Sequence, residues 1–254
     1  MESFLFEMIS LDTPHLFLNL FLVIFPKYPI KLRVNHVETF PILLQNLKMP
    51  SSSITSLAAS TRLPLRPPPY EPAVAAAVQS TAFKGLSPLN LRLALANHDR
   101  LGPAFQALAH VVLFQCTLPE RDREIAIIRT GALTRSEYEW GMHVSIYAGK
   151  CGLRPAQIDE LTRSKSWVDL SAGMWTDDER LIVRMVDELH CHSTLADETW
   201  KALSAAWPQE QVIELIFASS FYHMAAFFLN SAAVPLEHGS QRFPAGVSQA
   251  AVTK

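Results

Sequence analysis

Cysteine is scarce in this chain. The 254 residues include only three cysteines, Cys116, Cys151 and Cys191, and they are far apart in the sequence. No Cys-x-x-Cys pair occurs, so the minimal spacing of a zinc ribbon, a thioredoxin-type dithiol or a disulfide scaffold is missing. So few thiols fit a reducing compartment. We therefore expect a cytoplasmic protein, and organellar import is also compatible with the sequence.

The chain also lacks an excess of either charge, and the apolar run near its start is short. It has 22 basic and 24 acidic side chains, a net charge of −2 and a pI near 6.5. The apolar stretch of the opening section, residues 13–26, has 14 residues, fewer than the roughly 17–20 that a helix needs to cross a bilayer. No cationic segment precedes this stretch, as one would in a signal peptide. We predict that neither nucleic acid nor a membrane is a partner.

Glycine and tryptophan are missing from the first part of the chain. Ten of the 17 prolines lie at or before Pro72, the first glycine is Gly85, and all five tryptophans follow residue 139. We interpret residues 1–48 as a non-native or disordered extension, because they resemble translated non-coding sequence. The clustered prolines predict an extended strap over residues 49–85. The same division gives a helical domain over residues 86–238 and a flexible tail over residues 239–254.

Apolar residues recur at three- and four-residue spacing from residue 86 onward, which is typical of amphipathic helices. Thr176 and Glu179 form a capping box before one helix, and Gly152 is placed to end another. No period-2 run of β-branched residues lies between turn signals, so the predicted fold class is all-α. The predicted helices cover residues 88–98, 101–115, 119–133, 136–151, 155–162, 180–190, 197–206 and 209–232.

The segment from residue 124 to residue 143, EIAIIRTGALTRSEYEWGMH, gathers polar groups that can carry chemistry. A tight break near Thr134 predicts two antiparallel helices. Glu124 and His143 both lie about 14 Å from this turn at the helical rise of ~1.5 Å per residue, so they can face each other. Ser136, Glu139 and His143 form one stripe on the second helix. The spacing therefore predicts a shared site between the helices.

Proton transfer is the chemistry that this set of residues favours. A buried pair of glutamates raises the pKa of at least one carboxyl group, and a nearby imidazole can relay the proton. Structural alternatives remain, because Ser136 and Glu139 also match a capping box, and Glu139 and His143 match an ordinary i,i+4 pair. Two histidines flank Cys191, but alternate residues diverge on a helix, so we predict no metal site.

The stretch PERDREIAIIRTGALTRSEYEWGMHVSIYAGKCGL resembles the signature region of the carboxymuconolactone decarboxylase family, including its AhpD-like alkylhydroperoxidase branch. The stretches PLNLRLALANHDRLGPAF, DDERLIVRMVDELH and FYHMAAFFLNSAAVPLE agree with this resemblance. It implies an AhpD-like helical bundle that assembles as a homo-oligomer, a trimer or a hexamer. It also implies a small-molecule substrate and an activity that needs no metal or organic cofactor.

The resemblance departs from the peroxidase branch at two positions. That branch carries a glutamate twelve residues before a Cys-x-x-Cys-x-x-x-His motif, whereas this chain has Ser136 and Glu139 in the cysteine positions, with Glu124 and His143 in place. Dithiol redox chemistry is therefore absent. The remaining groups favour an enzyme of the decarboxylase type, with His143 as proton donor or oxyanion partner. Glu139 would orient the imidazole, and Glu124 would complete the relay.

A substrate with a carboxylate needs a cation nearby, and Arg129 or Arg135 is the candidate. Tyr222 and His223 are further substrate-binding candidates, with a core or subunit-interface role as their alternative. We expect a cofactor-independent lyase that acts on a small cyclic carboxylic acid. The alternatives are an AhpD-like alkylhydroperoxidase or peroxiredoxin-type antioxidant protein and a catalytically silent oligomer that binds a ligand. The same acid–base groups could also serve tautomerisation, hydration or elimination.

Overall fold

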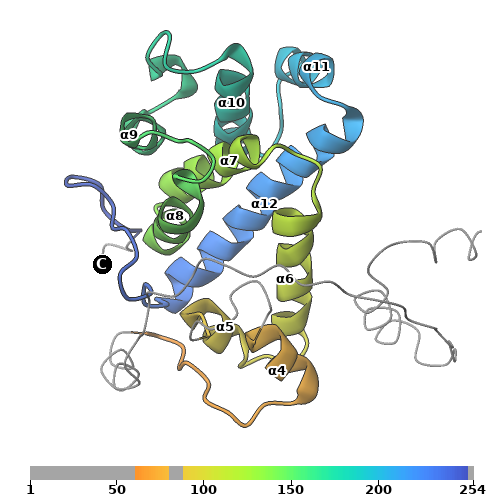
Figure 1. The fold of residues 1–254 in the computed structure, drawn as a ribbon, viewed down its shortest axis with the longest axis vertical. Coiled ribbons are helices and arrows are strands. Elements are labelled where there is room, and N and C mark those ends of the chain that lie inside the picture. Colours follow the sequence, from red (N-terminus) through yellow and green to blue (C-terminus); the bar gives the residue numbers. More distant parts are fainter. Residues whose placement is uncertain (1–60, 80–87, 251–254) are drawn as a thin grey trace, which may run out of the picture. The chain divides into compact units, whose positions relative to one another are not determined.

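The computed structural model describes residues 61–79 and 88–250, and the predicted extension at residues 1–48 lies outside them. No strand occurs in this part of the chain, which agrees with the predicted all-α class. Two short π-helical segments, Val111–Gln115 and Val144–Ala148, continue the α-helices before them, and Trp167–Asp169 is a 3₁₀ turn. The elements are α4 (Pro72–Val78), α5 (Asn90–Leu95), α6 (Leu101–His110), η4 (Val111–Gln115), α7 (Glu120–Leu133), α8 (Glu137–His143), η5 (Val144–Ala148), α9 (Pro155–Arg163), η6 (Trp167–Asp169), α10 (Asp177–His192), α11 (Asp197–Ala206) and α12 (Gln209–Ala232) (Figure 1).

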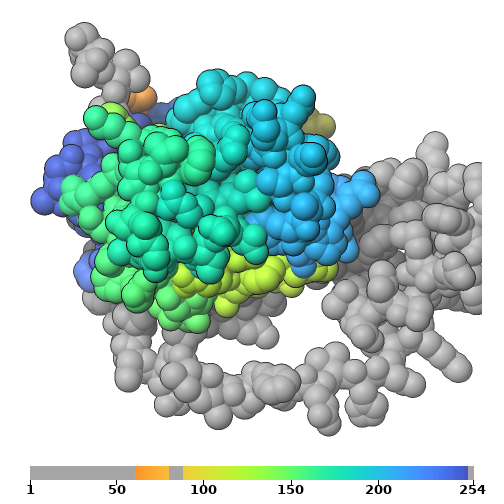
Figure 2. All heavy atoms as spheres, turned by 90° about the horizontal axis from the view of Figure 1, so that it is seen from above, coloured from red at the N-terminus to blue at the C-terminus, as the bar shows by residue number. Residues whose placement is uncertain are grey.

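Helix α7 is the central element of the domain. It packs against α8, α9, α10 and α12, and residues 123–132 are all buried. A helix that is covered on all sides needs apolar residues around its whole circumference, which the run Ile125–Ile128 provides. Figure 2 looks onto the end of the domain that carries α10 and α11 and shows their side chains covering that end. The polar groups that α7 carries are thus enclosed among neighbouring helices.

The α7–α8 connection is as tight as the sequence predicts. Arg135 adopts a left-handed conformation with φ 51°, and the Ser136 amide donates to the Gly131 carbonyl at 2.9 Å. Gly131 also permits the close approach of the two helices, because a Cβ atom there would lie 3.0 Å from the backbone nitrogen of Trp140. The glycine therefore lets α7 and α8 pack close enough for side chains to meet between them.

Helix α12 runs past α7 and α8 along most of the domain (Figure 1). Among the described helices it is the one that is long and apolar enough to span a bilayer by length and composition, and half of its most apolar stretch is buried in the domain. Burial of this kind is expected for the core helix of a globular domain. Its side chains Phe221 and Tyr222 pack with Ile127 of α7 and Ala109 of α6.

The structure corrects several predicted boundaries. The strap predicted as extended contains helix α4, because the alanine-rich sequence after Pro72 favours a helix and proline is tolerated in the first turn. The first predicted helix shortens to α5, and the helix predicted to reach residue 151 ends after η5. The Thr176–Glu179 capping box is confirmed. In the predicted flexible tail, Phe243 is buried against Trp140.

Candidate active site

The imidazole of His143 meets the carboxylate of Glu124 at the interface between α7 and α8. Nδ1 of the ring lies 2.7 Å from Oε2 of Glu124, and both side chains are buried. The contact forms because the two residues lie at similar distances from the turn on antiparallel neighbours. The predicted helix pairing therefore brings the acid and the ring into hydrogen-bond contact.

Arg123 holds the other oxygen of the same carboxylate. Its Nε and Nη2 donate to Glu124 Oε1 at 3.2 and 3.1 Å, and its Nη1 donates to the Leu113 carbonyl at 2.9 Å. A carboxylate in an ion pair is only an acceptor, so the nitrogen of His143 that faces it must carry the proton. With Nδ1 donating to Glu124, the neutral ring presents Nε2 as a free acceptor on its other side.

Glu139 faces this second nitrogen. Its Oε2 lies 4.0 Å from Nε2 of His143, which is beyond direct hydrogen-bond distance. Burial raises the pKa of the Glu139 carboxyl to about 7, although the nearby His143 ring acts in the opposite direction. Near neutral pH the carboxyl is therefore divided between its protonated and ionised forms. A general acid needs a pKa in this range.

The contacts reverse the predicted arrangement of the two glutamates. Glu139 was expected to orient the imidazole, but Glu124 makes the direct contact with the ring and Glu139 does not. The reason lies in helix packing, because the short distance between α7 and α8 brings Glu124 closer to the ring than the i,i+4 spacing brings Glu139. Glu139 is instead directed into a cleft.

Ser136 does not join this group through a hydrogen bond. Its Oγ is buried and has no hydrogen-bond partner, and it does not cap the first turn of α8. The capping-box interpretation of Ser136 and Glu139 is therefore wrong. The predicted convergence of four side chains reduces to three, namely Glu124, Glu139 and His143.

The open side of this group is a cleft between α5, α6 with η4, α8 with η5, and α12. Its empty space, including the open mouth, is about 580 Å³, within the usual range for small-molecule sites. Most of the lining is apolar, and a few polar groups interrupt it. The lining residues are Leu89, Leu91, Arg92, Phe105, Gln106, Ala109, Leu113, Phe114, Tyr138, Glu139, Met142, His143, Ile146, Tyr147, Phe221 and Tyr222.

Two tyrosines fix the plane of the His143 ring. Tyr147 stacks on it with a centroid distance of 5.2 Å, and Tyr222 meets it edge-on at 4.7 Å. Burial raises the pKa of Tyr147 to about 12 and raises that of Tyr222 well above its usual value. Both phenols therefore stay protonated at neutral pH and can donate hydrogen bonds. The cleft thus combines an oriented imidazole, a carboxyl group of raised pKa and phenolic donors.

Comparison with known proteins finds a family that resembles part of this chain. Residues 100–176, which contain Glu124, Ser136, Glu139 and His143, match the model of the carboxymuconolactone decarboxylase family. The similarity to this family therefore covers the segment from α6 to η6. The match ends before α12 and begins after α5, so it does not include Tyr222 or Arg92. A search of curated protein sequences finds no match.

Two solved structures are similar to this chain. One is an alkylhydroperoxidase AhpD core, an uncharacterised peroxidase-related protein from Ralstonia eutropha, with 16% sequence identity, a TM-score of 0.60 and coverage of 70% of this chain and 93% of the other. The second is a protein of unknown function from Agrobacterium tumefaciens, described as a candidate antioxidant defence protein AhpD. It has 17% identity, a TM-score of 0.48 and coverage of 56% of this chain and 93% of its own. The first likeness supports the AhpD-like fold.

Three of the predicted substrate-binding residues lie away from the cleft of this AhpD-like domain. Arg129 is buried in an ion pair with Asp187 at 2.7 Å. Arg135 is exposed at the α7–α8 turn, where its carbonyl accepts from the Ala250 amide. His223 points to α10, with its Nε2 3.0 Å from Nδ1 of His190. The fourth candidate, Tyr222, lines the cleft as predicted.

Sequence reasoning missed the cation that does line the cleft. Arg92 comes from α5, and it is buried among the apolar residues of LNLRLAL. Its position in an otherwise apolar helix was a signal that could have found it, because a charge at such a place needs a local reason. The supporting roles of Arg123 and Tyr147 were also missed. Both contacts are local in the sequence, because Arg123 is next to Glu124 and Tyr147 lies four residues after His143, so these residues could have been found from spacing.

Proposed function

We propose that this AhpD-like protein is a cofactor-independent lyase of the decarboxylase type that acts on a small cyclic carboxylic acid. The observation that carries the proposal is the pairing of two groups in one mainly apolar cleft. One is the carboxyl of Glu139, with a pKa of about 7, and the other is the His143 ring held by Glu124. Together they suit the addition of a proton to a carbon atom after CO₂ has left.

The proposed reaction separates bond cleavage from protonation. The bond between the ring carbon and the carboxylate breaks, CO₂ leaves, and the electron pair remains on the substrate as an enolate or dienolate. The protonated carboxyl of Glu139 then donates its proton to carbon and becomes a carboxylate. The neutral His143 ring stands 4.0 Å from Glu139 and can relay a proton from solvent to restore the acid. Hydrogen bonds from Tyr147 or Tyr222 stabilise the developing oxyanion.

The antioxidant alternative would require a reactive thiol in the cleft. None of the three cysteines lines it. Burial raises the pKa of the Cys151 thiol, which lowers its thiolate fraction at neutral pH. The positions that carry cysteines in the peroxidase branch hold Ser136 and Glu139, neither of which can form a disulfide. These observations favour acid–base chemistry over hydroperoxide reduction.

Replacement of Glu139 by glutamine should remove one limb of the pH–rate profile. The wild-type rate of CO₂ release should be high below pH 7 and fall as the pH rises above about 7, because the donor must be protonated. The groups that face Glu139 are His143 and Tyr138 on its own helix and Tyr222 on α12. E139Q should release CO₂ at least tenfold more slowly and without this limb. The measurement is CO₂ release from a panel of cyclic carboxylic acids between pH 5 and 9.

The matched control for this experiment is the variant in which Cys116, Cys151 and Cys191 are all serine. It should release CO₂ at the wild-type rate. Consumption of an alkyl hydroperoxide by the wild type, lost in the cysteine-free variant, would instead support the antioxidant alternative. An E139Q variant with an unchanged pH–rate profile would exclude Glu139 as the proton donor.

We also propose that the protein forms homo-oligomers through an apolar stripe on α12. The stripe consists of Ile213, Phe217, Met224 and Phe227, of which Phe217 is 55% and Phe227 63% exposed. Spacings of 4, 7 and 3 residues place all four on one side of a helix. Between Ile216 and Ala232 the helix carries no Asp, Glu, Lys or Arg. A second copy can therefore pack on the stripe without charge repulsion, which supports self-association.

Introduction of two charges into the stripe should dissociate this oligomer. In F217E/F227E, each new carboxylate would lose its hydration on assembly, so the wild-type oligomer should become a monomer at micromolar concentration. Light scattering coupled to size-exclusion chromatography measures the change. Trp200, which is 51% exposed on α11, provides the control W200E, expected to keep the oligomer. A monomeric wild type, or an oligomeric double variant, would contradict the proposal.

A further inference from the structure

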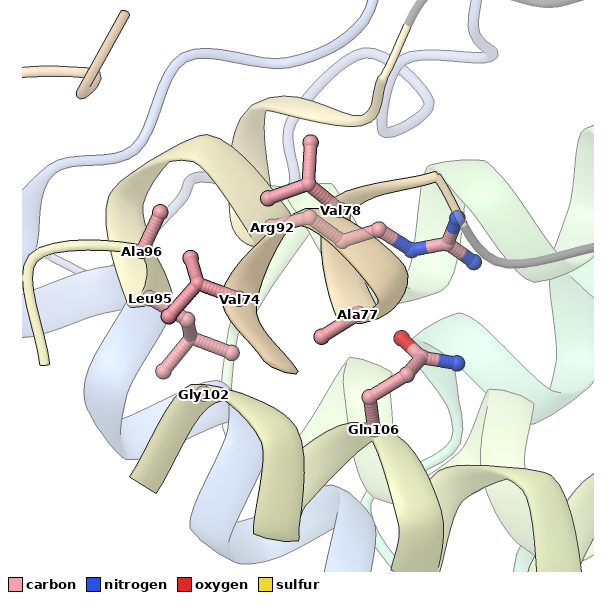
Figure 3. Close-up of a pocket in the computed structure, with 8 residues that line it drawn as sticks. All are labelled: Val74, Ala77, Val78, Arg92, Leu95, Ala96, Gly102 and Gln106. Atoms are coloured by element: carbon pink, nitrogen blue, oxygen red, sulfur yellow. The ribbon is translucent and has the colours of Figure 1, made fainter. Parts of the chain in front are cut away.

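Two polar side chains form the boundary between the cleft and a second, smaller cavity. The second cavity lies between α4, α5 and α6, and its empty space, including the open mouth, is about 220 Å³. Arg92 and Gln106 are the residues that line both spaces. The rest of the small cavity is apolar, with Val74, Val78 and Leu95 among its lining residues. Figure 3 shows the guanidinium of Arg92 and the amide of Gln106 extending toward the same side.

The Arg92 guanidinium places a positive charge in a poorly hydrated part of the domain. Arg92 is only 8% exposed, and an arginine stays charged even when it is buried. Tyr138, Tyr147 and Glu237 are among the groups that interact with it. Oε1 of Glu237 accepts the Tyr138 hydroxyl and the Asn90 amide, each at 2.5 Å. The fold thus keeps a fixed cation at the wall of the cleft.

This cation and the acid–base pair occupy different parts of the cleft. Arg92 comes from α5 and acts on Tyr138 and Tyr147, whereas Glu139 comes from α8 and interacts with His143. Between these polar groups the lining is apolar, with Leu91, Met142 and Phe105. A ligand that spans the cleft therefore meets a cationic end, an apolar middle and an acid–base end.

We propose that Arg92 and Gln106 bind a second carboxylate of the substrate, one that is not lost as CO₂. The inference rests on the proposed function and adds to it the residues that recognise the anion. A guanidinium presents N–H donors in a planar fork that matches two carboxylate oxygens, and the Gln106 amide supplies another N–H donor. The apolar middle of the cleft then holds the ring of the ligand, and its reacting carbon is directed to Glu139 and His143.

Binding of benzoate, compared with neutral benzamide, tests this assignment without knowledge of the natural substrate. By isothermal titration calorimetry, the wild-type protein should bind benzoate at least tenfold more tightly than benzamide, which corresponds to about 1.4 kcal/mol. In R92Q the two ligands should bind with similar affinity. R92K keeps the charge but not the fork, and Q106L removes one donor, so both should show a smaller loss. These two variants keep the test valid if R92Q does not fold.

The matched control is R100Q, which removes the same charge from an exposed position just before α6. It should bind benzoate like the wild type. Benzoate affinity that is unchanged in R92Q, R92K and Q106L would overturn the assignment. Once a substrate is found, R92K should raise KM with little change in kcat, because binding that is equal in ground and transition states acts on KM. Dependence of benzoate binding on Arg92, together with no CO₂ release by the wild type from any acid of the panel, would refute the lyase and keep the carboxylate site.

Discussion

Replacement of His143 by alanine should lower the rate of CO₂ release by about 10²- to 10⁴-fold, the usual contribution of a general acid–base group. The ring is the only described side chain that contacts Glu124 on one side and lies opposite Glu139 on the other. Its loss removes the proton relay that restores Glu139 and leaves an empty space between Tyr147 and Tyr222. We expect the decrease in kcat, because the ring acts on a reacting proton rather than on binding.

Two further variants separate chemistry from structure at this position. H143N retains an N–H donor that can reach Glu124 but has no second nitrogen to face Glu139. It should therefore lose the same activity while keeping the fold. H192A removes a histidine that is exposed at the end of α10 and should leave the rate unchanged. Circular dichroism and the oligomeric state verify that each variant folds. Full activity in H143N would contradict the relay, whereas no CO₂ release by the wild type would favour the catalytically silent oligomer.

Replacement of Asp187 by alanine should reduce the free energy of unfolding by about 3–5 kcal/mol, because it leaves a buried charge without its partner. Oδ1 of Asp187 accepts from Arg129 Nε at 2.7 Å, and Oδ2 accepts from the Trp167 amide at 2.7 Å. Arg129 also donates to the carbonyls of Leu161 and Ser164. This ion pair therefore connects α7 to α9, α10 and η6 around the core.

Urea unfolding measures this loss as a lower transition midpoint with an unchanged slope. The control is D159A, which removes the partner of Arg163 in a pair whose side chains are 42% and 51% exposed. Exposed pairs contribute about 0–1 kcal/mol, so D159A should unfold almost like the wild type. The double variant R129M/D187L removes both charges and should recover much of the stability. A loss below 1 kcal/mol in D187A would show that Arg129 is solvated or paired by other means.

The patterns that the sequence determined are those within one helix or across one short turn. Apolar spacing predicted most of the helices, including Asp197–Ala206 and Gln209–Ala232 with their observed bounds. The capping box at Thr176 and the tight turn at Arg135 are also local features, set by backbone groups within a few residues. The contact between Glu124 and His143 could be predicted because one short connection forces the two helices together.

The tertiary structure decided which groups share the cleft. Arg129, Arg135 and Arg92 are all arginines near apolar helices in the sequence, yet only Arg92 lines the cleft. Arg129 instead pairs with Asp187, 58 residues further along the chain. Which partner an arginine meets depends on how α5, α9 and α10 pack around α7. The spacing of residues within one helix contains no information about that packing.

The positions of the two glutamates show the same limit. Their spacing relative to His143 predicted that both could approach the ring, but not which one would contact it. The close packing at Gly131 brings Glu124 to Nδ1, and the rotation of α8 directs Glu139 into the cleft. Burial there raises the pKa of Glu139 to about 7. The residue types came from the sequence, whereas their distances, solvation and therefore their proposed roles arise from how the helices pack in three dimensions.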